Sequence, residues 1–129
     1  MNPLTVTARV VSSGPVVQVA GDLDYDSAHR LRDQLAALEL RPGQRLVVDL
    51  AALGLCDSSG IGALLFARNR ASSARAEIVL VAVSDQLWRT LHRLGLDQVF
   101  ACAPDAAEGH QKGSGAGWSS AARGFAAGG

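Results

Sequence analysis

The chain has 129 residues, of which 48% are hydrophobic and 19% are charged, and its 12 basic and 12 acidic side chains leave no net charge. These values are typical of one globular domain built around one core. The even charge balance gives no global electrostatic reason to expect nucleic acid or an anionic membrane as the partner.

Other sequence features favour a cytoplasmic protein without a metal centre. No apolar run approaches the roughly 20 residues that cross a bilayer, and the N-terminus lacks the pattern of a signal peptide. Neither Cys56 nor Cys102 lies in a Cys-x-x-Cys motif, so both are expected to be structural thiols. The three histidines, His29, His92 and His110, lack metal-ligand spacing. We expect neither a metal nor another cofactor.

The N-terminal fifth of the chain has the pattern of a β-hairpin. Residues 4–11 alternate between apolar and other side chains, which predicts a strand exposed on one face. Residues 16–20 form a second run rich in β-branched side chains, and the turn-forming residues 12–15 lie between the two runs.

A helix is predicted from Tyr25 onward, because apolar residues then recur at intervals of three and four. Asp24 is the expected N-cap, and Asp26 is expected to add favourable charge in the first turn. The apolar stripe consists of Ala28, Leu31, Leu35 and Leu38.

The remaining elements alternate between strands and helices. Residues 46–50 predict a buried strand, residues 59–72 a helix, and residues 78–83 another strand. Ser84 is expected to cap a third helix, and residues 99–101 are expected to form a last short strand. The order β-β-α-β-α-β-α-β predicts one α/β domain with a mixed sheet of about five strands, an initial hairpin followed by parallel crossovers, and about three helices.

The composition changes after residue 104. Residues 105–129 are mostly Ala, Gly and Ser, and they contain too few large apolar groups to offset the entropy cost of ordering. We therefore expect a folded domain over residues 1–104 and a disordered tail over residues 105–129. Trp118 in this tail has no assigned role.

The segment from Asp57 to Gly62 carries the functional signal. It reads Asp-Ser-Ser-Gly-Ile-Gly, and it places two hydroxyls and two glycines at the start of a helix that follows a buried strand. Unpaired N–H groups and the positive end of the helix dipole lie there, so a phosphoserine is tolerated. On local physics alone, Asp57 or Ser58 is simply the N-cap, and the glycines allow close packing.

Two motifs resemble the STAS domain of anti-sigma factor antagonists. The family's signature is a strand ending in Asp-Leu, a loop, and then Asp-Ser-Ser/Thr-Gly-Leu/Ile-Gly at the start of a helix, and residues 57–62 match it at every position. Residues 21–24, Gly-Asp-Leu-Asp, are similar to the family's Gly-Glu-Leu-Asp. The resemblance covers the element order over residues 4–101.

The resemblance implies a binding module rather than an enzyme, in a bacterial pathway that regulates transcription by partner switching, for example in a stress response. The unphosphorylated chain would bind an anti-sigma factor that is also a serine kinase, and so release a sigma factor. Phosphorylation of Ser58, or of Ser59 in reserve, would end the binding, and a serine phosphatase would restore it. The expected partner-binding residues are Asp22, Asp24, Asp57, Ser58, Ser59 and Gly60.

Three other interpretations are weighed against this one. A serine hydrolase is disfavoured because Gly-x-Ser-x-Gly is absent, and a nucleotide-binding protein is disfavoured because no phosphate-binding glycine motif is present. The third interpretation lies within the resemblance, since STAS domains also serve as accessory subunits of transport systems and as scaffolds of stress-sensing assemblies.

Trp88 is expected in the core. A solvated face is expected for Arg68, Arg70, Arg89 and Arg93.

Overall fold

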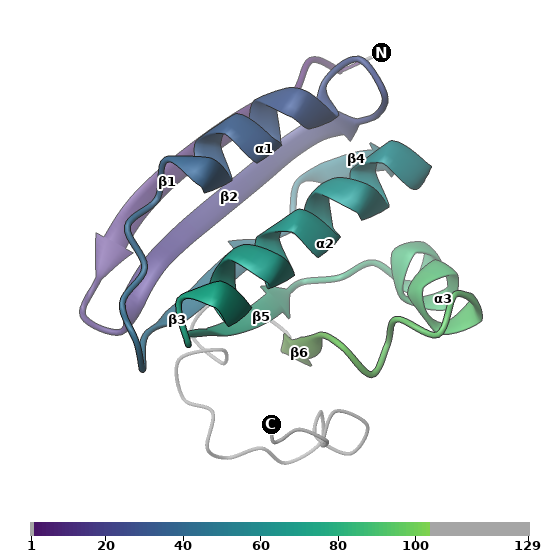
Figure 1. The fold of residues 1–129 in the computed structure, drawn as a ribbon. Helices are drawn as coiled ribbons and strands as arrows, with labels where there is room; N and C mark the ends of the chain where they lie inside the picture. The colour runs from purple at the N-terminus through teal and green to yellow at the C-terminus, as the bar shows by residue number, and fades with distance from the viewer. Residues whose placement is uncertain (1, 104–129) are drawn as a thin grey trace.

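The structure of the protein is a computed structural model that describes residues 2–103 (Figure 1). The predicted tail at residues 105–129 and its Trp118 lie outside the described residues. The elements, in chain order, are β1 (Thr5–Val11), β2 (Gly14–Leu23), α1 (Ala28–Ala36), β3 (Arg45–Asp49), β4 (Leu53–Cys56), α2 (Ser58–Ser73), β5 (Glu77–Val81), α3 (Asp85–Arg93) and β6 (Ala101–Ala103).

The strands form one mixed sheet in the order β1-β2-β3-β5-β6. β1 and β2 are antiparallel, and the other pairs along this path are parallel, as the predicted hairpin and crossovers require. The predicted α/β fold is therefore confirmed. The sheet also has a sixth strand, β4, which pairs with the end of β2 in a segment that we expected to be a loop.

Gly14 lets the hairpin lie beside β3. It begins β2 with a φ of +139°, in a region that side chains rarely adopt, and a Cβ atom there would lie 2.3 Å from the carbonyl oxygen of Arg45. Ser12 and Ser13 alone connect β1 to β2. The predicted turn is thus tighter than the sequence pattern suggested.

α1 and α2 lie side by side on one face of the sheet, as Figure 1 shows. The main core is formed between these helices and the strand residues that point toward them. α1 contributes the predicted Leu31 and Leu35, while α3 adds Leu87 and Leu91 from its own apolar side. Trp88 is half-buried and packs against this core, close to the prediction.

α1 and β6 both begin later than predicted. α1 begins at Ala28 rather than at Tyr25, because the backbone first makes a turn in which the Asp24 carbonyl accepts from the N–H groups of Ser27 and Ala28. Asp26 therefore lies before the helix, and the N-cap is Ser27, so the predicted places of Asp26 in the first turn and of Asp24 as the N-cap were both wrong. β6 begins at Ala101, two residues later than expected.

Arg70 does not belong to a solvated face. Its Nε donates to the Leu35 carbonyl at 3.1 Å, and its Nη2 donates to the Leu38 carbonyl. These oxygens lie at the end of α1, where carbonyl groups lack partners within the helix. Arg70 therefore ties α2 to the C-terminus of α1, and the prediction for this residue was wrong.

Candidate functional site

The N-terminus of α2 is capped by a carboxylate. Asp57 has extended backbone angles, and its Oδ1 accepts from the N–H groups of Ser59 at 2.9 Å and of Gly60 at 3.1 Å. An aspartate in this position satisfies donors that the helix leaves unpaired, and its charge suits the helix dipole. The local interpretation of Asp57 as an N-cap is confirmed.

Ser58 is the first residue of α2 and is exposed. Within residues 2–103 its hydroxyl has no hydrogen-bond partner, because Asp57 already caps the helix. The neighbouring Ser59 is only partly exposed. Of the two serines in the motif, Ser58 is therefore more open to an approaching protein.

Asp22 holds β4 against the end of β2. Its Oδ1 accepts from the Leu55 N–H at 3.0 Å, and its Oδ2 accepts from the Asn2 N–H at 3.1 Å. These two hydrogen bonds, that from Leu55 first, lower the pKa of the Asp22 carboxyl below its ordinary value. A Cβ on Gly54 would lie 2.7 Å from Asp22 Oδ1, so the strand approaches this closely only with glycine there.

Asp24 organises the turn between β2 and α1. Its Oδ1 accepts from the N–H groups of Asp26 and Ser27, both at 3.1 Å, and from the buried Ser27 hydroxyl at 3.0 Å. The Asp57 N–H donates to the Leu23 carbonyl at 3.2 Å and so joins this turn to the start of α2. The segment that carries Asp22 and Asp24 is thus joined to the start of α2, where Asp57 and Ser58 lie.

The three carboxylates have a structural role. Each one accepts hydrogen bonds from backbone N–H groups and thereby fixes a loop: Asp22 fixes β4, Asp24 fixes the turn before α1, and Asp57 fixes the start of α2. The positions of the three carboxylates are therefore fixed within the fold. This structural role was not evident from the sequence.

The two glycines of the motif differ in role. Gly60 is buried, and a Cβ on it would lie 2.7 Å from Cys56 Sγ and 2.8 Å from the Leu23 carbonyl oxygen. Gly62 is exposed, and a Cβ there would meet nothing within 4 Å. Gly60 therefore allows α2 to pack against β2. Because Gly60 is buried, its exposure gives no support to its predicted place in the partner-binding surface.

Two exposed apolar side chains near the site were missed by the sequence analysis. Tyr25, directly after Asp24, is 81% exposed, and Leu55 in β4 is 53% exposed. A recess of about 290 Å³ has Asp22, Asp24, Asp26 and Arg30 among its lining residues. Tyr25 was taken as the first helical residue and Leu55 as part of a loop, so neither stood out.

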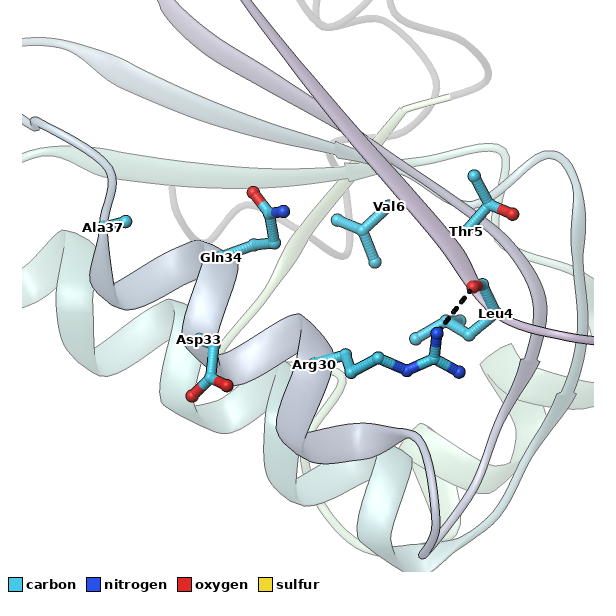
Figure 2. Close-up of a pocket in the computed structure, with 7 residues that line it drawn as sticks. All are labelled: Leu4, Thr5, Val6, Arg30, Asp33, Gln34 and Ala37. Carbon is cyan, nitrogen blue, oxygen red and sulfur yellow. Dashed lines mark hydrogen bonds between the residues drawn. The ribbon is translucent and has the colours of Figure 1, made fainter.

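A second hollow lies between β1 and α1. It has a volume of about 540 Å³, and Figure 2 shows Arg30 reaching from α1 across it to donate to the Leu4 carbonyl at 3.4 Å. Asp33 and Gln34 also line it. No residue of either predicted motif lines this hollow, and we assign it no chemistry.

The cysteines and histidines do not form a reactive centre within the described residues. Both thiols are free, and burial raises the pKa of Cys56 to about 11 and that of Cys102 to about 12, so they are protonated at neutral pH. Within residues 2–103, no group of three or more His, Cys, Asp and Glu side chains could hold a metal ion. In the same range, no helix is long and apolar enough to span a membrane.

The sequence matches a protein-family model described as "Mlab, STAS domain" over residues 6–101. It is also similar to a curated anti-sigma-B factor antagonist of Listeria monocytogenes. The two are 29% identical over 82 residues, which cover 64% of this chain and 72% of the relative.

Solved structures share the fold. An anti-sigma factor antagonist from Mycobacterium paratuberculosis aligns with a TM-score of 0.72 and 24% identity over 82% of this chain and 90% of its own. The anti-sigma factor antagonist SpoIIAA in its unphosphorylated form aligns with a TM-score of 0.60 and 18% identity over 87% of this chain and 100% of its own. A sulfate transporter family protein from Wolinella succinogenes aligns with a TM-score of 0.63 and 20% identity over 72% and 78%.

Proposed function

Because the chain belongs to the STAS domain family, we propose that it is an anti-sigma factor antagonist whose binding is switched off by phosphorylation of Ser58. A STAS domain of this kind is a binding module and not an enzyme. In the proposed cycle, the unmodified chain binds an anti-sigma factor that is also a serine kinase and thereby releases a sigma factor. A serine phosphatase returns the chain to the binding state.

The observation that carries the proposal is the free, exposed hydroxyl of Ser58 next to a carboxylate cap. Since Asp57 occupies the N–H groups of Ser59 and Gly60, a kinase can modify Ser58 without removing a cap. The helix dipole also favours added negative charge at this end. The modification is therefore compatible with the fold.

The same charge opposes docking. Phosphorylation adds about −1.5 to −2 charges at neutral pH. A like-charge contact with an acidic group of the partner, at about 4 Å and an effective dielectric constant near 20, costs about 4 kcal/mol, or roughly a thousandfold in affinity. Asp22, Asp24 and Asp57 already make this surface acidic, so phosphorylation makes it strongly anionic and repels an acidic group of the partner.

The side chains around Ser58 indicate how the partner would bind. Tyr25 and Leu55 offer exposed apolar area on the two segments that Asp22 and Asp24 hold in place. Exposed aromatic side chains are common anchors in protein interfaces. We propose that the anti-sigma factor places apolar groups on Tyr25 and Leu55.

The test is a pull-down with the unmodified chain, followed by mass spectrometry of the partner and of the peptide that contains Ser58. With the captured kinase and ATP, Ser58→Ala should still bind but accept no phosphate, whereas Ser59→Ala should be labelled normally. Labelling of Ser58→Ala at the normal level would show that the site is assigned wrongly. If neither the unphosphorylated wild-type chain nor Ser58→Ala bound an anti-sigma factor, the proposed function itself would be contradicted.

The alternative function is that of an accessory subunit of a transport system, because a sulfate transporter family protein has a similar fold. That neighbour shares 20% identity, which supports a common fold and no more. A pull-down that recovers transporter subunits in place of a kinase would support this alternative. Recovery of a large multiprotein assembly would instead support the role of a stress-sensing scaffold.

A further inference from the structure

β1 is an open edge of the sheet within the described residues. It pairs with β2 on one side, and no strand of residues 2–103 pairs with its other side. All seven of its residues run in continuous antiparallel register with β2, and Arg9 is the only charged residue among them. Natural sheets usually protect an open edge with bulges, prolines or charges, because its backbone groups can pair with another strand. β1 has little of this protection.

Alternate residues of β1 direct their backbone groups away from β2. In an antiparallel pair, opposite residues exchange hydrogen bonds only at every second position. Val11 and Gly14 flank a two-residue loop and are such a bonded pair, so the bonded positions of β1 are its odd-numbered residues. The Leu4 carbonyl follows this alternation, since it accepts from Arg30 at 3.4 Å (Figure 2). The strand residues whose N–H and C=O groups face outward are Val6, Ala8 and Val10.

The same edge carries an exposed valine and a hollow. Val10 is 78% exposed. Val6 lies four residues earlier on the same face of β1, packs against the main core and lines the hollow of about 540 Å³ between β1 and α1. Figure 2 shows the Val6 side chain directed toward α1. This hollow is larger than one valine side chain, so it has room for a further apolar group.

We propose that two copies of this chain pair through β1, antiparallel and about a two-fold axis at Ala8. In this register Val10 of the second copy lies opposite Val6, and its side chain enters the hollow beside Val6. The two-fold axis makes the fit reciprocal, so both exposed valines become covered. An unrelated strand offers the same backbone groups, but the matching positions of Val6 and Val10 favour a second copy.

Two further features fit this register. The pairing ends where Arg30 occupies the Leu4 carbonyl, because Leu4 lies opposite Ser12 of the second copy, which belongs to the turn after β1. Arg9 lies opposite Thr7 of the second copy. The two arginines are therefore not directly opposed, a placement that would weaken the pairing.

Analytical ultracentrifugation of the full chain tests the pairing. The wild type should show a monomer–dimer equilibrium in which the dimer fraction rises with protein concentration. Val10→Lys should weaken dimerisation by about tenfold or more, because it brings a charge into an apolar contact. Leu94→Lys is the matched control, since it replaces an apolar side chain that is 58% exposed directly after α3, and it should dimerise like the wild type. A wild type that stays monomeric, or equal affinities of the two variants, would overturn the proposal.

Cysteine cross-linking tests the register. Opposed, hydrogen-bonded residues of an antiparallel pair have Cα atoms about 5.5 Å apart, within the range of a disulfide. Ala8→Cys should therefore form a covalent dimer with oxidised glutathione, above the background of the wild type. Thr5→Cys is the control, because it is also exposed on β1 but would lie about 20 Å from its counterpart. Absence of the Ala8→Cys dimer, or equal cross-linking of both variants, would overturn the proposal. Neither measurement involves Ser58, so the proposed function is tested separately.

Discussion

The starts of α2 and α3 present exposed serines in two different ways. At α3, Ser84 is the N-cap, and its hydroxyl accepts from the Leu87 N–H at 3.1 Å. At α2, Asp57 is the cap, and the hydroxyl of Ser58 beside it has no partner within the described residues. Both serines are exposed, so exposure alone does not distinguish a structural hydroxyl from one that is available for modification.

The difference lies in which residue satisfies the helix N–H groups. A serine cap that is modified can no longer serve as the same acceptor, and the helix start must rearrange. A carboxylate cap separates the two tasks, because it stabilises the helix while the next residue remains free. The motif Asp-Ser at this position therefore has a physical meaning that a lone serine at a helix start lacks.

The largest expected effect is a difference in affinity for the anti-sigma factor between a Ser58 variant and a Ser84 variant. Ser58→Asp places a fixed negative charge where the partner is proposed to dock, and it should weaken binding of the anti-sigma factor by about 4 kcal/mol, or roughly a thousandfold. Ser84→Asp keeps the cap of α3 and lies beside Leu55 rather than at the start of α2, so it should weaken binding far less. Titration calorimetry with the purified partner measures both values. Equal losses in the two variants would show that Ser58 has no special place in the interface.

The two glycines of the α2 start give the next largest difference, this time in stability. Gly60→Ala forces a methyl against the Leu23 carbonyl and Cys56 Sγ, so it should lower the free energy of unfolding by about 1–3 kcal/mol. Gly62→Ala meets nothing within 4 Å and should raise it by up to about 1 kcal/mol, because alanine is the better helix former. Urea unfolding measures both. Destabilisation by Gly62→Ala would contradict the open surroundings that the structure gives it.

The features that the sequence predicted correctly depend on residues that lie close together in the chain. The apolar spacing of three and four residues identified the buried side of α1, and the motif located Asp57 and Ser58 at a helix start, because both signals are local. β4 was missed because its pairing with β2 depends on the Asp22 carboxylate, which is distant in sequence from the Leu55 N–H that it binds. Arg70 was misjudged for the same reason, since its carbonyl partners lie on another helix.

Stability measurements sharpen the comparison between the two caps. Asp57→Ala and Ser84→Ala each remove the side-chain acceptor of a helix start, and each should cost about 1 kcal/mol in the free energy of unfolding. Ser58→Ala removes a hydroxyl without a partner and should change the stability by less than about 0.5 kcal/mol. Thermal melts of the three variants check this order. A loss for Ser58→Ala as large as that for Ser84→Ala would show that Ser58 shares in capping α2.

The smallest expected effect concerns pH and the carboxylate that holds β4. Because the N–H groups of Leu55 and Asn2 lower the pKa of Asp22 from 3.8, the folded chain binds this proton less readily than the unfolded chain does. The stabilisation is therefore present above about pH 3.8 and is lost as the pH falls through the lower pKa of the folded state. The asparagine in Asp22→Asn does not titrate, so the melting temperature of this variant should lie below that of the wild type at pH 7. The difference between the two melting temperatures should be smaller at pH 3. A gap that stays constant between these pH values would mean that the Asp22 charge does not hold β4, and that the surface around Ser58 is fixed by Asp24 and Asp57 alone.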